Sequence, residues 1–444
     1  MSSDGTAITV AIVSLGCPKN LIDSEKICAH LAEGGCVVGA PMDEADVIVV
    51  NTCGFLSAAR QESLAVIAEA VACKRTGRAR RVVVAGCLVN RDAEKLYDLA
   101  EGIDAVVGVN DRDDILRAIR GEQRATLISP PGAAVSDAGR FRLTPRHTAY
   151  LRIAEGCGQK CTFCTIPAIR GPFRSKRPAD VLAEAAELIA DGTVELNVIA
   201  QDTTSYGMDL AGQTDLADLL AELDGPEGAT WIRLMYAYPL RFTDKLIDAI
   251  AAAEHVLPYV DIPLQHVADG VLRRMGRGVD RADVERLLTK LRSRVPNVAI
   301  RTTFIVGFPG ETEAQFAELL EFVEDFGFDA MGVFEFSPEE GTPAARLSGA
   351  VPDDVKADRA EQLMLAQQQI AFAANEQAIG QTIDVLVDGA DNEDRSVGRH
   401  AGQAPEVDSV CILTEPAEAG GIIAAEVVGW ADYDLLVRPV ADQS

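Results

Sequence analysis

The sequence lacks the features that direct a protein into a membrane or out of the cell. Its first residues, Met1 to Gly5, carry no basic segment, and no apolar run approaches the length of a signal-peptide core or a membrane span. We therefore expect a cytoplasmic protein without a membrane partner. Because thiols stay reduced in that compartment, the ten cysteines indicate metal or thiol chemistry rather than a disulfide framework.

Basic residues are scarce. The chain has 41 Lys and Arg against 68 Asp and Glu, a formal net charge of −27, and residues 376–444 hold 14 acidic residues against three basic ones. A surface of this kind repels nucleic-acid phosphates and attracts a basic protein. We therefore expect a basic protein partner, attracted by acidic residues such as Asp391, Glu406 and Asp408, and we do not expect nucleic acid as the main substrate.

A length of 444 residues is enough for about two to four domains. We predict an α/β chain in four segments. They are an N-terminal α/β domain over 7–122, a linker with prolines and small residues over 123–146, a barrel domain over 147–375 and a small β-domain over 376–444.

The strand pattern supports this division. Three β-rich runs, each followed by a helical pattern, predict a buried parallel sheet in the first segment: 8–15, 45–50 and 81–85. Six strand signals alternate with helical ones in the third segment and predict an open (βα)6 barrel: 149–154, 195–200, 231–236, 257–264, 298–306 and 330–336. A helix over about 353–378, followed by short β runs, predicts a C-terminal β-barrel.

Each of the first three runs ends at a cysteine. Cys17, Cys53 and Cys87 follow these runs directly, and sites in open α/β sheets lie beyond the carboxyl ends of the strands. The three thiols could therefore converge on one metal site. The alternative is three unrelated small residues in turns, because Cys is common in protein cores; the repetition favours a site.

A second set of cysteines lies in one loop after the first strand of the barrel. Cys157, Cys161 and Cys164 are close enough in sequence to hold three irons of a four-iron cluster and to leave the fourth iron open. A zinc site is the alternative, but it usually needs four protein ligands in paired spacings. No second pair follows Cys164, and His147 is the only nearby histidine.

The C-x-x-x-C-x-x-C spacing at 157–164 occurs together with six other motifs. They are S-L-G-C-P-K-N at 14–20, N-T-C-G-F at 51–55, G-C-L at 86–88, Q-D-T at 201–203, D-I-P-L-Q-H at 261–266 and F-I-V-G-F-P-G-E-T at 304–312. In this order they resemble the radical S-adenosylmethionine (SAM) methylthiotransferase family. The resemblance covers nearly the whole chain and includes a C-terminal module similar to the TRAM β-barrel.

Within that family the chain most resembles the RimO type, which modifies an aspartate of small-subunit ribosomal protein twelve. The transfer RNA branch, the MiaB type, usually has a Y-G-C-Q-M-N-like first motif, whereas this chain has S-L-G-C-P-K-N. Two features depart from the family pattern: Gly158 in place of a common Asn, and an additional basic residue within 174–178. Neither changes a predicted cluster ligand.

The resemblance implies two 4Fe-4S clusters and two uses of SAM. Cys157, Cys161 and Cys164 would hold the cluster that binds SAM and generates a radical, and the other three cysteines would hold the cluster that supplies sulfur. Methylation of that sulfur by a second SAM would yield the methylthio group, which is added to the β-carbon of the aspartate. A flavodoxin-like or ferredoxin-like electron donor and an external sulfur source are implied as partners.

Residues at the ends of barrel strands are the candidates for contact with SAM, because sites in such barrels lie at the carboxyl ends of the strands. We select Gln201, Asp202, Gln265, Arg301 and Gly307. Packing or capping at the strand ends is the alternative role for each of them.

Two other functions stay open at this stage. One is a transfer RNA adenosine methylthiotransferase, which the acidic C-terminal segment and the first cysteine motif disfavour. The other is an iron-sulfur electron carrier or scaffold without catalysis, which would leave the long barrel segment without a purpose.

Overall fold

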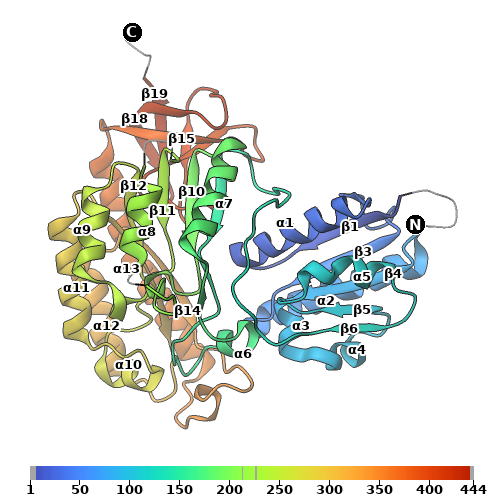
Figure 1. The fold of residues 1–444 in the computed structure, drawn as a ribbon. Coiled ribbons are helices and arrows are strands. Elements are labelled where there is room, and N and C mark those ends of the chain that lie inside the picture. The colour runs from blue at the N-terminus through green and yellow to red at the C-terminus, as the bar shows by residue number, and fades with distance from the viewer. Residues whose placement is uncertain (1–6, 213, 226–227, 441–444) are drawn as a thin grey trace.

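The computed structural model describes residues 7–212, 214–225 and 228–440, and Figure 1 shows three parts along the chain. An α/β domain at the N-terminus lies beside a larger α/β unit, and a small β-barrel covers one end of that unit. The predicted fold class is confirmed. In the described part of the chain no helix is long and apolar enough to cross a membrane.

The first sheet has six parallel strands in the order β2-β1-β3-β4-β5-β6. They are β1 (Thr9–Ser14), β2 (Val37–Val38), β3 (Val47–Thr52), β4 (Arg81–Gly86), β5 (Ala105–Val107) and β6 (Ala125–Leu127). The α-helices are α1 (Pro18–Glu33), α2 (Ser57–Thr76), α3 (Cys87–Asp92), α4 (Leu96–Leu99) and α5 (Ile115–Arg120). Separate apolar clusters lie on the two faces of the sheet, so β3 and β4 are buried at every residue.

Three of these strands correspond to the predicted runs, and the short strands were missed. β6 lies inside the segment predicted as a linker, where it pairs in parallel with β5 and ends the first sheet at Leu127. Residues 128–147 then cross to the second unit without helix or strand. Strands of two or three residues give too little periodicity to stand out in a sequence.

The second sheet also has six parallel strands, in the order β14-β13-β12-β11-β10-β7, and all six were predicted. They are β7 (Thr148–Arg152), β10 (Glu195–Ile199), β11 (Trp231–Leu234), β12 (Val256–Asp261), β13 (Ala299–Val306) and β14 (Ala330–Glu335). The helices are α6 (Ile166–Arg170), α7 (Pro178–Ala190), α8 (Leu216–Leu223), α9 (Asp244–Ala252), α10 (Asp269–Met275), α11 (Arg281–Arg294), α12 (Glu313–Phe326) and α13 (Asp353–Ala378). β7 and β14 form opposite edges, so the barrel stays open between them.

The two faces of this sheet differ in character. Alternate residues of a strand face opposite sides, and Leu196 and Val198 of β10 belong to the apolar core beneath the outer helices. On the inner face, Glu195 pairs with Arg233 of β11 at 2.9 Å, and both are completely buried. The half-barrel therefore encloses buried ion pairs together with a second apolar cluster, which includes Tyr150, Trp231 and Tyr259.

A closed five-stranded barrel forms the C-terminal part, as predicted. Its strands are β15 (Thr382–Ala390), β16 (Ser396–His400), β17 (Cys411–Leu413), β18 (Ile422–Ala431) and β19 (Asp434–Pro439). Asp408, on the loop before β17, accepts hydrogen bonds from Tyr259 Oη at 2.8 Å and Arg301 Nε at 3.1 Å, and its side chain is 4% exposed. The expectation that Asp408 attracts a partner at the surface is therefore wrong, because its charge is buried and paired within the chain.

A buried ionic network joins the first domain to the second. Asp137, on the segment between the sheets, pairs with Arg112 of the first domain at 2.5 Å and with Arg152 and Lys176 of the second at 2.7 Å each. Arg112 and Arg152 both also pair with Asp23 of α1 at 2.8 Å. Burial alone would raise the pKa of Asp137, but the three cations hold it well below its usual range.

Replacing Asp137 tests the importance of this network. Asp137→Asn leaves buried cations without their carboxylate, so we expect a loss of about 3–5 kcal/mol in the free energy of unfolding at pH 7, measured by urea denaturation. A carboxyl with a lowered pKa stabilises the fold above its unfolded pKa and loses that contribution as pH falls through its folded pKa. The difference between variant and wild type should therefore shrink below about pH 4. Asp180→Asn, which removes an exposed pair with Arg177, is the matched control and should change little.

Candidate metal centres

The three N-terminal cysteines lie at one edge of the first sheet. Cys17 follows β1 and precedes α1, Cys53 lies between β3 and α2, and Cys87 is the first residue of α3 after β4. Since β1, β3 and β4 are parallel neighbours, their carboxyl ends meet at this edge. Cys17 is exposed, Cys53 is partly buried and Cys87 is buried.

Two glycines show how closely these loops approach one another. Gly16 has φ +91°, and a Cβ added there would lie 3.1 Å from the Sγ of Cys53. A Cβ on Gly54 would lie 2.8 Å from the Cα of Leu88, the residue after Cys87. Larger side chains at either position would push the loops apart. The structure thus brings together the three cysteines that the sequence suggested.

The second set lies in the loop after β8 (Ala154–Glu155), a short strand paired with β9 (Arg174–Ser175). Gln159 Nε2 in this loop donates to Asp202 at 2.7 Å, and the Thr162 amide donates to the Met275 carbonyl at 2.9 Å. Cys157, Cys161 and Cys164 are all partly buried. Hydrogen bonds to two other segments therefore fix this loop, which lies beside the interface between the two domains.

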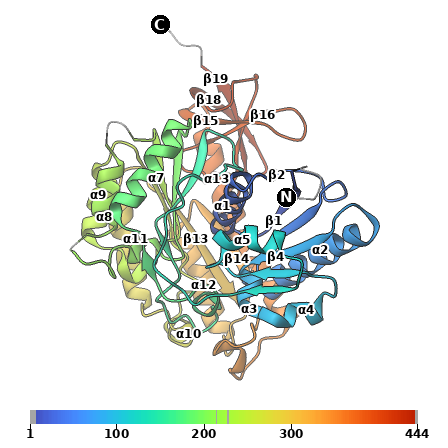
Figure 2. The ribbon, with the colours of Figure 1, turned by 45° about the vertical axis from the view of Figure 1, so that its right-hand side comes forward.

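The two sets face each other across that interface. Thr165, directly after Cys164, donates its hydroxyl to the carbonyl of Phe55, two residues after Cys53, at 3.1 Å. Helix α6 packs against α3 beside this contact, as Figure 1 shows, and Figure 2 shows the N-terminal domain turned toward the viewer beside the second unit. Both sets therefore lie at the carboxyl ends of their own sheets and at the same junction.

The arrangement fits clusters better than single ions. In the described residues, no group of three or more His, Cys, Asp or Glu is placed to hold one metal ion. Ligands of a single zinc ion must all lie about 2.0–2.3 Å from it, whereas three cysteines of a four-iron cluster each bind a different iron and stand farther apart. With no fourth Cys or His found beside them in the described part of the chain, three thiols would leave one iron of a four-iron cluster open in each set.

Three of the candidate ligand thiols hold their protons firmly. Burial raises the pKa of Cys157 to about 11 and that of Cys164 and Cys87 to about 12. Iron must therefore displace protons when it binds. The guanidinium of Arg170 opposes the shift at Cys87 and favours its thiolate.

Arg170 and Arg277 are neighbours of the cysteines that the sequence analysis missed as site residues. Arg170 is 2% exposed, and its Nη2 lies 3.5 Å from Asn20 Oδ1, beside Cys87. Arg277 donates from Nη1 to the Sγ of Cys161 at 3.5 Å. The sequence does not indicate that either arginine is buried, because the contacts that bury them come from distant parts of the chain. Both arginines stabilise negative charge on the sulfurs.

Three of the five candidates for SAM contact have observed local roles. Asp202 caps the 3₁₀ turn Thr203–Ser205 and accepts the bond from Gln159. Arg301 pairs with Asp261 at 3.1 Å, and Gly307 has φ +71° with the stem of Lys356 where a Cβ would lie.

The other two candidates, Gln201 and Gln265, show features that these local roles do not explain. The amide oxygen of Gln201 is buried without a hydrogen-bond partner among the described residues, and Gln265 has φ +74°. Contact of any of the five candidates with SAM stays a prediction.

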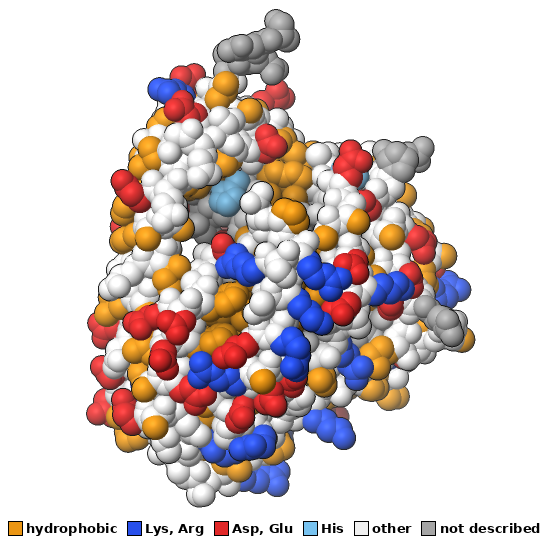
Figure 3. Space-filling view, turned by 90° about the vertical axis from the view of Figure 1, so that its left-hand side faces the viewer, with side chains coloured by type: hydrophobic (Ala, Val, Ile, Leu, Met, Phe, Trp, Pro, Cys, Tyr) orange, Lys and Arg blue, Asp and Glu red, His pale blue; other side chains and the backbone are white. Residues whose placement is uncertain are grey.

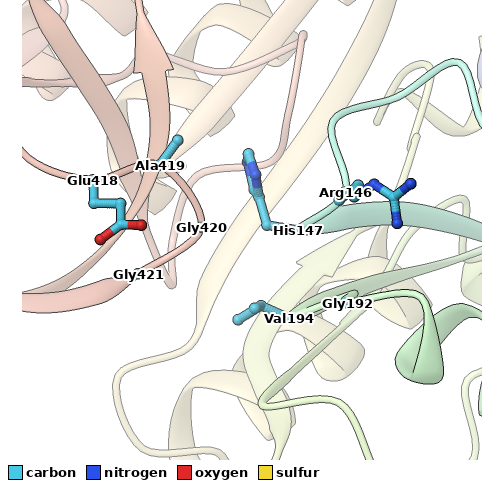
Figure 4. Close-up of a pocket in the computed structure, with 8 residues that line it drawn as sticks. All are labelled: Arg146, His147, Gly192, Val194, Glu418, Ala419, Gly420 and Gly421. Atoms are coloured by element: carbon cyan, nitrogen blue, oxygen red, sulfur yellow. The ribbon is translucent and has the colours of Figure 1, made fainter.

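A separate cavity of about 410 Å³ lies at the opposite end of the second sheet (Figure 4). Arg146, His147 and residues 418–421 line it, where the C-terminal barrel meets the amino end of β7. His147 Nε2 lies 3.1 Å from Asp388 Oδ1 of β15. The histidine weighed as a zinc ligand is therefore a structural contact, away from the cysteine loop.

Three family models match successive stretches of the chain. "Uncharacterized protein family UPF0004" matches residues 9–108, the "Radical SAM superfamily" matches 151–323 and the "TRAM domain" matches 379–440. Each stretch falls within one of the predicted segments.

Curated relatives match nearly the full length. The chain is 46% identical over 440 residues to the "Ribosomal protein uS12 methylthiotransferase RimO" of Anaeromyxobacter sp. (strain K), covering 98% of this chain and 94% of the relative. It is 43% identical over 437 residues to the protein of the same name from Pelotomaculum thermopropionicum, with 96% and 98% coverage.

A solved structure supports the fold. The radical SAM methyltransferase TsrM from Kitasatospora setae, with tryptophan and aza-SAM bound, superimposes with a TM-score of 0.56 at 17% identity, covering 87% of this chain and 79% of that one. At this identity the likeness concerns the fold alone.

Gly156 tests how the second cysteine loop is built. Its φ is +70°, and an added Cβ would lie 2.1 Å from the carbonyl oxygen of Pro172. Gly156→Ala should cost at least about 1–2 kcal/mol in backbone strain and lower the iron bound after anaerobic reconstitution. Gly158→Ala is the matched control, since its nearest contact is an ordinary 3.7 Å to Phe173. Equal iron content in both variants would contradict this account of the loop.

Proposed function

This chain belongs to the RimO-type radical SAM methylthiotransferases, and we propose that it adds a methylthio group to the β-carbon of an aspartate in ribosomal protein uS12. The observation that supports this most is the placement of two cysteine sets, on two domains, against one interface. Two sites so close together suit a reaction in which one generates a radical and the other supplies sulfur.

Membership of the radical SAM superfamily implies SAM and an iron-sulfur cluster. The proposal goes further and assigns one 4Fe-4S cluster to Cys157, Cys161 and Cys164, and a second to Cys17, Cys53 and Cys87. When bound, the first cluster with SAM would supply the radical that removes hydrogen from carbon, and the second would supply the sulfur of the methylthio group.

The protein's own residues position this chemistry. Gln159 and Asp202 hold the second cysteine loop, Arg277 donates to Cys161, and Arg170 favours the thiolate of Cys87. A radical route is needed because the hydrogen on a carbon beside a carboxylate is too weakly acidic for a side-chain base at neutral pH. The contacts between the two domains hold the two sites in a fixed relative position.

The remaining partners follow from the proposed chemistry. A flavodoxin-like or ferredoxin-like protein would supply electrons, another source would supply sulfur, and the cytoplasm would hold both enzyme and ribosomal substrate. The acidic C-terminal barrel would attract a basic protein through its exposed residues, such as Glu406. On the face of the molecule that Figure 3 shows, the acidic side chains at the top stand apart from one another, so attraction on this face would be diffuse.

Mass spectrometry of the ribosomal protein tests the proposal directly. We expect uS12 from cells with this chain to carry a methylthio adduct on one aspartate, and uS12 from cells without it to lack the adduct. Unmodified uS12 together with a methylthio nucleoside in transfer RNA that depends on this chain would overturn the assignment.

The barrel cysteines should control radical formation. Replacing Cys157, Cys161 and Cys164 by Ala should reduce the iron bound by reconstituted protein from about eight atoms to about four and abolish reductive SAM cleavage. The double variant of Cys36 and Cys73, which lie outside both sets, should retain the full iron content. SAM cleavage in the triple variant would refute the assignment of this cluster.

The N-terminal cysteines should control sulfur delivery alone. Their replacement by Ala should also remove about four irons but leave reductive SAM cleavage measurable, because the other cluster lies on a separate domain. No methylthio product should form on uS12. A normal yield of product would show that the sulfur comes from elsewhere.

A further inference from the structure

Lys19 is a buried cation at the junction of the two cysteine sets. It follows Cys17 by two residues, near the start of α1, and is 6% exposed. Its Nζ lies over the ring of Tyr236, 2.9 Å from the centroid, at the carboxyl end of β11. The side chain therefore extends from the N-terminal domain to the mouth of the barrel.

Lys19 differs from the other buried cations in the described residues in having no hydrogen-bond acceptor. Most of them, such as Arg170 and Lys176, form ion pairs with carboxylates. Arg81 and Arg277 lack a carboxylate but donate to backbone carbonyls. Among the described residues, the close contact found for Lys19 Nζ is the face of the Tyr236 ring, a weaker partner than a carboxylate.

The carboxylates nearest to Lys19 are already engaged. Asp261 pairs with Arg301 and accepts the Tyr236 amide at 3.1 Å, and Glu155 pairs with Arg170 and Arg152. A buried charge without a counter-ion is costly, so such a site favours an anion that arrives from outside.

The surrounding backbone also holds this contact in place. Tyr236 has φ +60°, an uncommon conformation for a residue with a bulky side chain. The backbone N–H of Tyr236 donates a hydrogen bond to Asp261, which fixes that conformation and holds the Tyr236 ring against the Lys19 ammonium. Residues in such conformations persist where the surrounding structure enforces them, often at functional sites.

We infer that Lys19 binds the side-chain carboxylate of the substrate aspartate. This inference rests on the proposed function, in which the carbon beside that carboxylate must lie between the two cysteine sets. An ammonium at this junction would pair with the carboxylate, replace the missing counter-ion and bring the β-carbon to the reacting groups. It would also reject a neutral side chain, which cannot compensate the charge.

The first test needs no substrate. Lys19→Met keeps the length of the side chain and removes a buried charge that has no counter-ion, so the unfolding temperature should stay equal or rise. Iron content and SAM affinity should not change. If SAM affinity falls while binding to uS12 is unchanged, Lys19 contacts SAM and the inference is overturned.

The second test measures equilibrium binding of reconstituted holoenzyme to uS12 carrying either Asp or Asn at the modified position. Wild type should bind the Asp form about tenfold more tightly, as expected for one charge-assisted hydrogen bond. Lys19→Met should remove this preference by weakening the Asp form alone, and Lys19→Arg should keep part of it. Equal weakening of both forms would indicate a merely structural role.

The outcomes separate this inference from the proposed function. If wild type neither binds nor modifies uS12, both fail together. If wild type modifies uS12 and the Asp/Asn preference is the same in Lys19→Met, the inference about Lys19 fails and the proposed function stands.

Discussion

The buried carboxylate of Asp137 is the constraint on which the domain arrangement depends. It lies on the segment between the two domains and pairs with cations from both domains, Arg112 on one side and Arg152 and Lys176 on the other. Charges buried this deeply are stable only when each is paired, so small displacements of one domain against the other are costly. Apolar contacts alone would tolerate sliding, because they are not directional.

This constraint matters because each cysteine set is built within its own domain. The ends of β1, β3 and β4 place the first set, and the loop after β8 places the second. Nothing in either sheet determines the distance between the sets; the interface does so. The hydrogen bond from the Thr165 hydroxyl to the Phe55 carbonyl then aligns the two cysteine loops locally.

The sequence predicted the elements that have strong local signals. Long apolar runs identified β3 and β4, and the cysteines at the ends of such runs indicated a shared edge because parallel strands end together. Short strands such as β5 and β6 gave no such pattern. The burial of Asp408 and Lys19 could not be predicted from the sequence, because charged residues are usually exposed. Only the tertiary structure shows which of them are buried and which have a partner.

The open half-barrel needs closure from outside its own sheet, and two elements provide it. The C-terminal barrel inserts its 401–408 loop at the amino end, where Ala401 accepts a bond from Arg233 at 2.7 Å. Helix α1 lies against the edge strand β7, where Ile22 packs in one cluster with Tyr150. With the amino end and the β7 edge covered, the carboxyl end of the half-barrel faces the N-terminal cysteines. Helix α1 both covers the edge of the half-barrel and begins directly after Cys17, so a displacement of the helix from that edge would also displace this cysteine. Helix α1 therefore connects the covered edge of the half-barrel directly to the first set of cysteines.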